Sequence, residues 1–221
     1  MPNDTKEAFE QTLVILDCET CSLAGGIIEI GLISFDTLED LLKVSEEDFR
    51  ERSLFSRHEN PIPIDAGAFA VHGISEKDVK GLPRYSASMD FYEKVKDFPA
   101  EQIVLIGHNV ISFDQKRLDL SDFHPAIDTL NLVRLLIKEE KLTHEGGNKL
   151  DFLVSIYCSK EQAHLKQFHG AIGDNWKVAI FLKYLLETHL KGATVEELCF
   201  LSAKATPAQK TRVLAAIASR L

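Results

Sequence analysis

A buried strand that ends in two carboxylates constrains this chain more than any other feature. Residues 13–16 are a continuous apolar run, which is typical of a strand covered on both faces. Asp17 and Glu19 follow that run, and because strand side chains alternate, both point to the same side. Two carboxylates at a buried strand end are costly unless they are paired or bound to a metal. The pattern therefore predicts a functional site at this strand end.

Two further acids and a histidine lie in distant stretches of the chain. Asp114 follows an apolar run at 103–107 and a short loop, a strand-to-helix junction where α/β folds place their sites. Asp174 lies near the start of a segment whose apolar residues suit a buried helix, and His169 precedes it by five positions. On a helix that gap turns about 500 degrees, so we expect His169 on the loop before it. Four carboxylates converging on one point repel each other, which predicts a pair of Mg²⁺ or Mn²⁺ ions between them.

The residues around these acids resemble the three motifs of the DEDDh exonucleases, the proofreading-type branch of the RNase H-like superfamily. The segments are Asp17-Cys18-Glu19-Thr20, Gly107-His108-Asn109 with Phe113-Asp114, and His169-Gly170-Ala171-Ile172-Gly173-Asp174. Residues 19–30 look most like bacterial exonuclease X. Supporting pieces occur at 70–74, 127–130 and 148–150, so the resemblance covers residues 12–190. There are two departures. Ser22 stands where the family usually has glycine, and three residues rather than two separate Asn109 from Phe113.

The resemblance implies an α/β chain with the RNase H-like fold, a mixed five-stranded sheet with helices on both faces. It also implies a metal-dependent 3′–5′ exonuclease that releases nucleoside 5′-monophosphates. By resemblance, Asp17 bridges two ions, Glu19 and Asp174 hold the ion beside the attacking water, Asp114 holds the second ion, and His169 is the general base. The residues expected to contact the terminal nucleotide are Thr20, Leu23, His72, Asn109 and Phe113.

Plainer interpretations exist for several of these residues. A single aspartate at a strand end is most often a turn or helix cap. His72 could cap a helix that begins near Ser75, and Leu23 could be an apolar turn residue that simply belongs to the core. Cys18 and Cys21 form a C-x-x-C pair, but no second pair follows at zinc spacing. Four scattered cysteines fit a reducing interior, so we expect a cytoplasmic protein without a membrane segment.

Length and composition predict one catalytic domain. The chain has 221 residues, 45% of them hydrophobic, enough for a sizeable core. We expect a flexible N-terminus at 1–11, an exonuclease domain at 12–192 and a helical extension at 193–221. Residues 36–52 exceed what a hairpin needs, and their pattern predicts an inserted amphipathic helix, either a solvated decoration or a surface that docks a protein partner. Other helices are expected at 86–96, 129–141, 149–158, 174–190, 195–201 and 207–221, with the third strand ending near Pro61.

The net charge limits how nucleic acid is held. With 25 Lys and Arg against 34 Asp and Glu, the charge is −9, the wrong sign for wrapping a long polyanion. An enzyme that grips a few terminal nucleotides through metals needs less basic surface. We therefore expect action on single-stranded 3′ ends, with DNA favoured over RNA because the resemblance is to a DNA exonuclease. Alternatives are an exoribonuclease on short RNA and an accessory subunit of a polymerase or helicase, and the oligomeric state stays open. Basic residues that could line a strand path, or only a solvated helix face, are Lys116, Arg117, Lys204, Lys210, Arg212 and Arg220.

Overall fold

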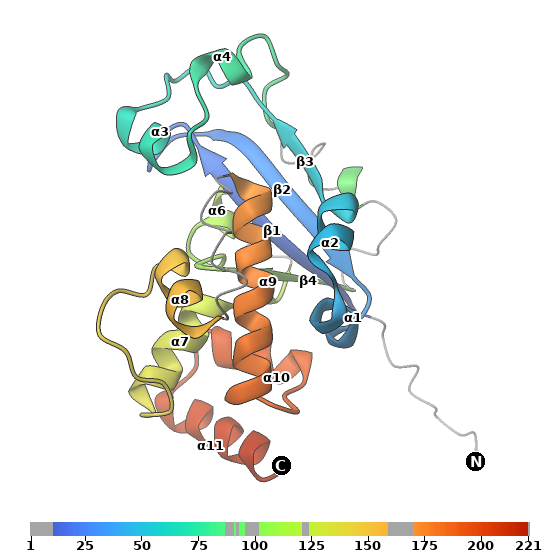
Figure 1. The fold of residues 1–221 in the computed structure, drawn as a ribbon, viewed down its shortest axis with the longest axis vertical. Coiled ribbons are helices and arrows are strands. Elements are labelled where there is room, and N and C mark those ends of the chain that lie inside the picture. Colours follow the sequence, from blue (N-terminus) through green and yellow to red (C-terminus); the bar gives the residue numbers. More distant parts are fainter. Residues whose placement is uncertain are drawn as a thin grey trace, which may run out of the picture.

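The computed structural model describes residues 11–86, 91, 93–95, 102–120, 124–158 and 170–220. A five-stranded mixed sheet lies at its centre (Figure 1). The strands are β1 (Thr12–Thr20), β2 (Ile27–Phe35), β3 (Leu54–Arg57), β4 (Ile103–Gly107) and β5 (Ala126–Asp128), in the order β3-β2-β1-β4-β5. The β1–β2 and β2–β3 pairs are antiparallel, while β1–β4 and β4–β5 are parallel. The predicted mixed sheet is confirmed, although β3 ends at Arg57, before Pro61.

Most expected helices are present within a few residues of their predicted bounds. The helices of the structure are α1 (Leu38–Lys43), α2 (Glu46–Arg52), α3 (Ala66–His72), α4 (Glu76–Val79), α6 (Asp114–Arg117), α7 (Thr129–Lys138), α8 (Leu150–Tyr157), α9 (Ala171–Thr188), α10 (Val195–Ser202) and α11 (Pro207–Ala218), as far as the described residues show. The helix α3 was not predicted. The helix expected at 86–96 lies largely outside the described residues. α9 starts three residues earlier than predicted, so Asp174 lies in its first turn rather than at its start.

Both faces of the sheet are covered, as the apolar run of β1 predicted. Leu13 and Ile15 lie in one buried cluster with side chains of α9, whereas Leu16 lies in a second cluster with Val110 and Leu118. α9 runs across β1 and β2 in Figure 1. The alternation along β1 therefore decides which side chains face α9 and which face α6.

The segment 36–52 forms two short helices in place of the single predicted one. Thr37 caps α1 and Ser45 caps α2, each accepting a backbone N–H three residues on. A capping serine in the middle of the segment starts a new helix, which explains the break. Phe49 is fully buried, and both helices contact α9. The inner face of the insertion thus belongs to the main core. For its outer face, both alternatives, a solvated decoration and a surface that docks a protein partner, stay predictions.

The C-terminal helices also pack into the main core. Leu198, Leu201, Leu214 and Ile217 are buried in the same cluster as the α9 face of the sheet. α10 contacts both α7 and β5 (Figure 1). Within the described residues, no helix has the length and apolar character needed to cross a bilayer.

Candidate active site

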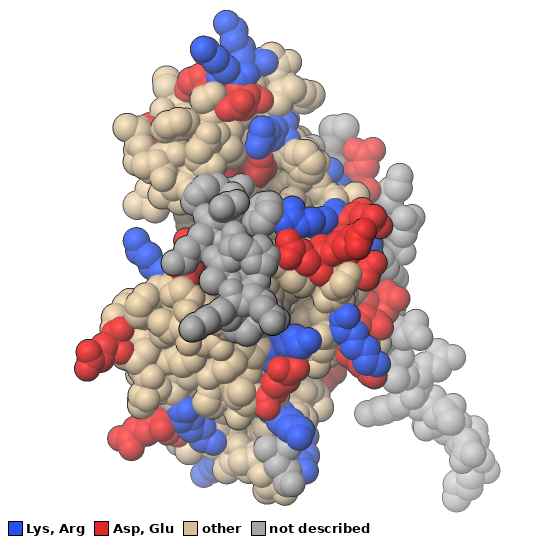
Figure 2. Space-filling model, in the orientation of Figure 1, with Lys and Arg blue, Asp and Glu red and all other residues tan. Residues whose placement is uncertain are grey.

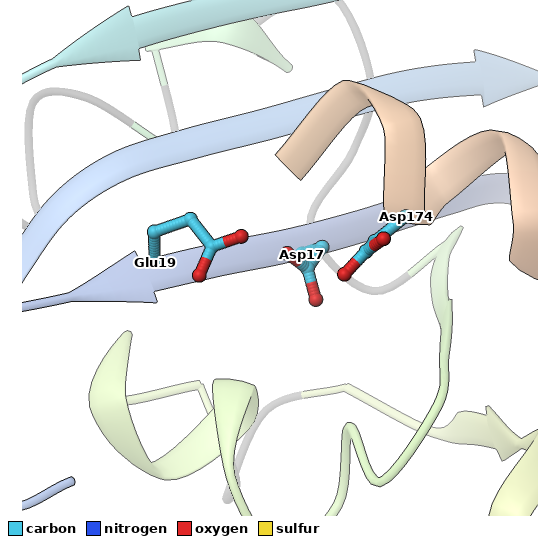
Figure 3. A group of neighbouring side chains, drawn as sticks. All are labelled: Asp17, Glu19 and Asp174. Atoms are coloured by element: carbon cyan, nitrogen blue, oxygen red, sulfur yellow. The ribbon is translucent and has the colours of Figure 1, made fainter. Parts of the chain in front are cut away.

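Three carboxylates meet where β1 passes beneath the start of α9. Asp17 and Glu19 continue the series Leu13 and Ile15, so their side chains emerge on the face that α9 covers. Asp174 reaches the same place from the first turn of α9 (Figure 3). Carboxylate oxygens of Asp17, Glu19 and Asp174 lie within 4.8 Å of one another. Glu19 and Asp174 are 155 positions apart in sequence. They are brought together because the helix α9 crosses the strand β1.

A glycine lets α9 approach the sheet this closely. Gly31 is the cross-strand partner of Asp17 in the β1–β2 pair. A Cβ built on Gly31 would lie 2.9 Å from the Cβ of Ala171 and 3.0 Å from the Cδ1 of Ile172. Those separations are well inside van der Waals contact, so any larger residue forces the start of α9 outward. Gly31 therefore determines how closely the start of α9, and with it Asp174, approaches Asp17 on β1.

A row of charges crosses the sheet beside the three carboxylates. Glu19 pairs with Glu29 across β1–β2, and Glu29 pairs with Arg57 across β2–β3. Arg57 Nε donates to Glu29 Oε2 at 2.6 Å, and the backbone N–H of Ala171 donates to Glu29 Oε1 at 2.9 Å. The α9 N-cap is Gly170, which has no capping side chain. Glu29 therefore supplies the anion that this helix start lacks.

Asp114 approaches β1 from the other side and stays outside the group of three. Its Oδ1 accepts the backbone N–H of Cys18 at 3.0 Å and the Cys18 thiol at 3.1 Å. β1 pairs with β4 only as far as Ile15, so the backbone of Cys18 is open to this contact. The Asp114 side chain is only 2% exposed. Cys18 therefore holds Asp114 in place, a role different from the zinc binding that a C-x-x-C pair can indicate.

Burial and mutual repulsion raise the pKa values of these acids. The pKa of Asp17 lies well above its ordinary value because of desolvation first, and then because of the charges of Asp114 and Asp174. Desolvation and the nearby Asp174 and Glu29 charges raise the pKa of Glu19 to about 8. Desolvation raises the pKa of Asp114 to about 7, although hydrogen bonds from Cys18 oppose the shift. In the absence of added positive charge, the site favours protonated acids.

One buried lysine supplies positive charge within the cluster. Lys177 Nζ lies 2.7 Å from Asp174 Oδ1 and 2.7 Å from Asp151 Oδ1, and its side chain is 4% exposed. Its charge also lowers the pKa of Glu19. Lys177 is therefore the internal counter-ion of the third carboxylate.

The second motif loop folds around a buried aspartate. The Asp128 carboxylate accepts the backbone N–H groups of Asn109 and Ile111 from this loop, and those of Leu130 and Asn131 at the start of α7. Asn109 has a left-handed backbone with φ of 71°. This turn accommodates the additional residue between Asn109 and Phe113.

His108 lies beside this loop and is held by α7 and the segment before α8. Its Nδ1 is 2.9 Å from Thr129 Oγ1, and its Nε2 is 2.8 Å from the carbonyl oxygen of Asn148. Burial lowers the pKa of His108. The sequence pieces 127–130 and 148–150 thus meet the second motif in space.

The turn between β1 and β2 projects an apolar side chain. Leu23 is 84% exposed. Arg117 of α6 donates hydrogen bonds to the carbonyl oxygens of Leu23 and Gly25, and its guanidinium lies 4.9 Å from the centre of the Phe113 ring. The Thr20 hydroxyl donates to Ser22 O at 2.8 Å inside the same turn. Leu23 is therefore a held, outward-pointing residue, and the alternative that it belongs to the core is wrong.

Of the two histidines expected at the site, His72 lies within the described residues and His169 does not. His72 is 5% exposed, and its Nδ1 accepts the backbone N–H of Ile74 at 3.0 Å, so one ring nitrogen is used within the α3–α4 turn. The cap of α4 is Ser75 with Asp78, not His72. His169 lies outside the described residues, and its role stays a prediction.

Sequence reasoning missed Gly31, Glu29, Lys177 and the capping role of Asp128. Three of them carried a signal. Glu29 and Lys177 are charged residues inside otherwise apolar segments, which is rare without a partner. Gly31 lies in a strand interior, where glycine often marks close approach of another backbone. Each signal indicates that a partner exists without saying which residue it is.

The donor set fits divalent cations. Carboxylate oxygens are the ligands that Mg²⁺ and Mn²⁺ prefer, and three of them lie within 4.8 Å of each other. Burial first, and then the neighbouring carboxylate charges, raise the pKa values of Asp17 and Glu19, so a cation bound here would favour their ionised forms. Asp17, Glu19 and Asp174 are thus the residues that could hold a cation, with Asp114 beside them.

The sequence matches a family model over residues 14–179, which is most of the chain. The model, named RNase_T, is described as Exonuclease. The chain belongs to this exonuclease family. Together with the acidic cluster, the match makes the protein a nuclease of the DEDDh 3′–5′ exonuclease type. Comparison with curated protein sequences gave no match.

Solved structures of exonucleases share the fold. Exonuclease X in complex with 5′-overhanging duplex DNA is 25% identical, with a TM-score of 0.55, and the match covers 86% of this exonuclease and 99% of that chain. E. coli exonuclease I in complex with a dA16 oligonucleotide is 14% identical with a TM-score of 0.60, covering 86% and 42% of the two chains. Cell-death related nuclease 4 is 18% identical with a TM-score of 0.58, covering 80% and 64%. The last two show likeness of fold only.

Proposed function

We propose that this exonuclease removes nucleoside 5′-monophosphates from single-stranded 3′ ends of DNA in a reaction that depends on Mg²⁺ or Mn²⁺. The observation that carries the proposal is the convergence of Asp17, Glu19 and Asp174 oxygens within 4.8 Å. Such a group, beside buried Asp114, has little use in a protein that only binds nucleic acid. Two ions per site fit four carboxylates better than one, because each ion offsets two negative charges.

Each acid has a distinct position for this work. Asp17 lies between Glu19 and Asp174 (Figure 3), and Asp114 is near enough for its charge to raise the pKa of Asp17, a position that suits a ligand shared by two ions. Divalent ions held by Asp17, Glu19, Asp174 and Asp114 would offset the carboxylate charge, lower the pKa of an attacking water and stabilise the leaving 3′-oxygen. His169, as general base, would contribute on the order of 100- to 10,000-fold to the rate.

Other residues of this chain keep the acids in place. Cys18 orients Asp114 through two hydrogen bonds, and the ion pair with Lys177 restricts the side-chain conformation of Asp174. Glu29 fixes the start of α9 through Ala171. Because a displacement of about 1 Å at reacting groups can cost about 100-fold in rate, such contacts matter for turnover.

The substrate end is proposed to lie between the Leu23 turn and the second motif loop. Leu23 is exposed and held by Arg117, a geometry that suits a wedge against the last base. Thr20, Asn109 and Phe113 border the same place through their turns, while His72 offers little exposed surface. DNA is favoured because the exonuclease X structure holds 5′-overhanging duplex DNA and that of exonuclease I an oligo-dA strand.

Chelation tests the metal dependence. Excess EDTA should abolish release of mononucleotides from a single-stranded oligonucleotide, and added Mg²⁺ or Mn²⁺ should restore it. Unchanged hydrolysis in chelator would rule out the metal mechanism. Asp17→Asn should lower turnover by several orders of magnitude with the fold retained, whereas Asp36→Asn, at an exposed position after β2, should behave as wild type.

Matched substrates test the direction of degradation and the preference for DNA over RNA. A 3′-terminal phosphate should stop degradation of labelled DNA, and equal digestion of blocked ends would indicate a 5′ or endonucleolytic activity. DNA and RNA oligonucleotides of one sequence, compared by kcat/KM, decide between the proposed deoxyribonuclease and an exoribonuclease.

A further inference from the structure

A basic groove lies between α7 and the connection from α10 to α11. Its volume is about 410 Å³. Its polar and charged lining residues are Ser112, Asn131, Arg134, Lys138, Ser202, Lys204 and Lys210. Among the described residues, no aspartate or glutamate lines it. A groove that gathers four cations and no acid is unexpected in a chain with a net charge of −9.

Several basic side chains outside the groove are paired with acids. Lys43 contacts Glu39, and Arg50 contacts Glu46, on the insertion whose intermixed charges are visible in Figure 2. By contrast, Arg134, Lys138 and Lys204 are exposed, and none forms a salt bridge with a described acid. The charge of these three residues is therefore available to an anionic ligand.

The walls of the groove are held rigidly. Asn131 Nδ2 donates to the carbonyl oxygen of Ser202 at 3.0 Å, which joins α7 to the end of α10. Lys210 Nζ donates to the carbonyl oxygen of Leu201 at 2.6 Å, which joins α11 to α10. Lys210 is thus partly used in holding the groove, while the other three cations project from fixed positions.

The groove is continuous with the second motif loop. Ile111 and Ser112 line its inner end, and they lie between Asn109 and Asp114 in sequence. Arg134 is close enough for its positive charge to lower the pKa of His108, in addition to the larger effect of burial. A strand whose 3′ end reaches the carboxylates past this loop would carry its earlier phosphates toward the groove.

We propose that this groove binds phosphates of the nucleic acid strand upstream of the scissile bond, through Arg134, Lys138 and Lys204. The inference rests on the proposed function and extends it from the terminal nucleotide to the strand behind it. It also explains how an acidic protein holds a polyanion, because binding needs local positive charge rather than net positive charge. The α10–α11 region, which the exonuclease motifs do not include, gains a role as one wall of the strand path.

The test compares two substrates and two charge-matched variants. The groove variant is Arg134→Gln, Lys138→Gln and Lys204→Gln. The control variant is Lys43→Gln, Lys183→Gln and Lys191→Gln, which changes net charge equally outside the groove. Lys43 and Lys191 are exposed, and the Lys183 side chain is 44% exposed. The substrates are a long single-stranded DNA oligonucleotide and the p-nitrophenyl ester of thymidine 5′-monophosphate, which occupies only the catalytic site. The measured quantities are KM and kcat at several salt concentrations.

With the oligonucleotide, the groove variant should raise KM about 10- to 100-fold near 0.1 M salt and reduce the slope of log KM against log salt by about 2, because each lost single-strand contact removes about 0.7. Its kcat/KM on the small ester should equal that of wild type. A groove variant that matches the control variant on the oligonucleotide, while wild type is active, would overturn the inference. Absence of hydrolysis of either substrate by wild type would instead overturn the proposed function.

Discussion

The Glu29 carboxylate accepts the backbone N–H of Ala171 at 2.9 Å, joining β2 to the first residue of α9. This contact spans 142 positions of sequence and lies one strand away from Glu19, the cross-strand partner of Glu29. Arg57 offsets the charge of Glu29 from the next strand. The start of the helix that carries Asp174 is thus positioned by a residue outside the catalytic motifs.

Gly31→Ala should lower activity more than it lowers stability. The new methyl group would meet Ala171 and Ile172 at about 3 Å and displace Asp174 from Asp17. We expect a loss of about 100-fold in kcat, because small displacements of reacting groups are costly, and about 1–3 kcal/mol in the free energy of unfolding from overpacking. Gly147→Ala, where an added Cβ meets nothing within 4 Å, is the control. Wild-type kcat in the Gly31 variant would show that the close approach is dispensable.

Stability of the metal-free protein should depend on pH through Glu19. Burial and nearby Asp174 and Glu29 raise its folded pKa from 4.5 to about 8, so folding favours the protonated acid. That contribution is fully present below the ordinary pKa and is lost as pH rises through about 8. Relative to Glu19→Gln, the melting temperature of wild type should therefore fall between about pH 5 and about pH 9. Added Mg²⁺ should reverse this fall in melting temperature. If the difference in melting temperature between wild type and Glu19→Gln did not change with pH, the prediction would be wrong.

Lys177→Met should destabilise the metal-free protein and make it more dependent on Mg²⁺. Removing the ammonium takes away the cation that lies 2.7 Å from Asp174 Oδ1. Because the Asp174 side chain is 34% exposed and water screens its charge, we expect a loss of about 1–2 kcal/mol, below the about 3–5 kcal/mol of a fully buried pair. Thermal unfolding with EDTA and with Mg²⁺ measures the effect, which should be smaller in Mg²⁺ because bound cations replace the lost charge. Lys183→Met, on the same helix but 44% exposed, is the control. Equal losses with and without Mg²⁺ would show that Lys177 acts only through packing.

Arg117→Gln should impair duplex ends more than single-stranded ends. The guanidinium holds the carbonyl oxygens of Leu23 and Gly25, so its loss frees the turn that presents Leu23. A wedge is needed only where the last base is paired. We expect kcat/KM on a recessed 3′ end to fall about tenfold more than kcat/KM on a single strand. A tenfold change corresponds to about 1.4 kcal/mol, which is the free energy of about one hydrogen bond to a charged group. Lys116→Gln, one residue earlier on α6, is the control, and equal effects on both substrates would remove the wedge role.

The sequence by itself determined the α/β class, the buried strands and the candidate acids. Alternation along β1 was enough to place Asp17 and Glu19 on one face, and most helix bounds followed from apolar periodicity and capping residues. The capping role of Ser45 was not recognised from the sequence, and for this reason one helix was predicted where the structure has two.

Only the tertiary structure decided which partners complete the site. Cys18 holds Asp114, Glu29 positions α9 and Lys177 compensates Asp174, and the basic groove needs α7 and the α10–α11 connection side by side. The physical reason is that periodicity reports which face of an element is buried, but not which element covers it. That choice depends on strand register, helix approach and side-chain rotamers, which are set by packing between residues far apart in sequence.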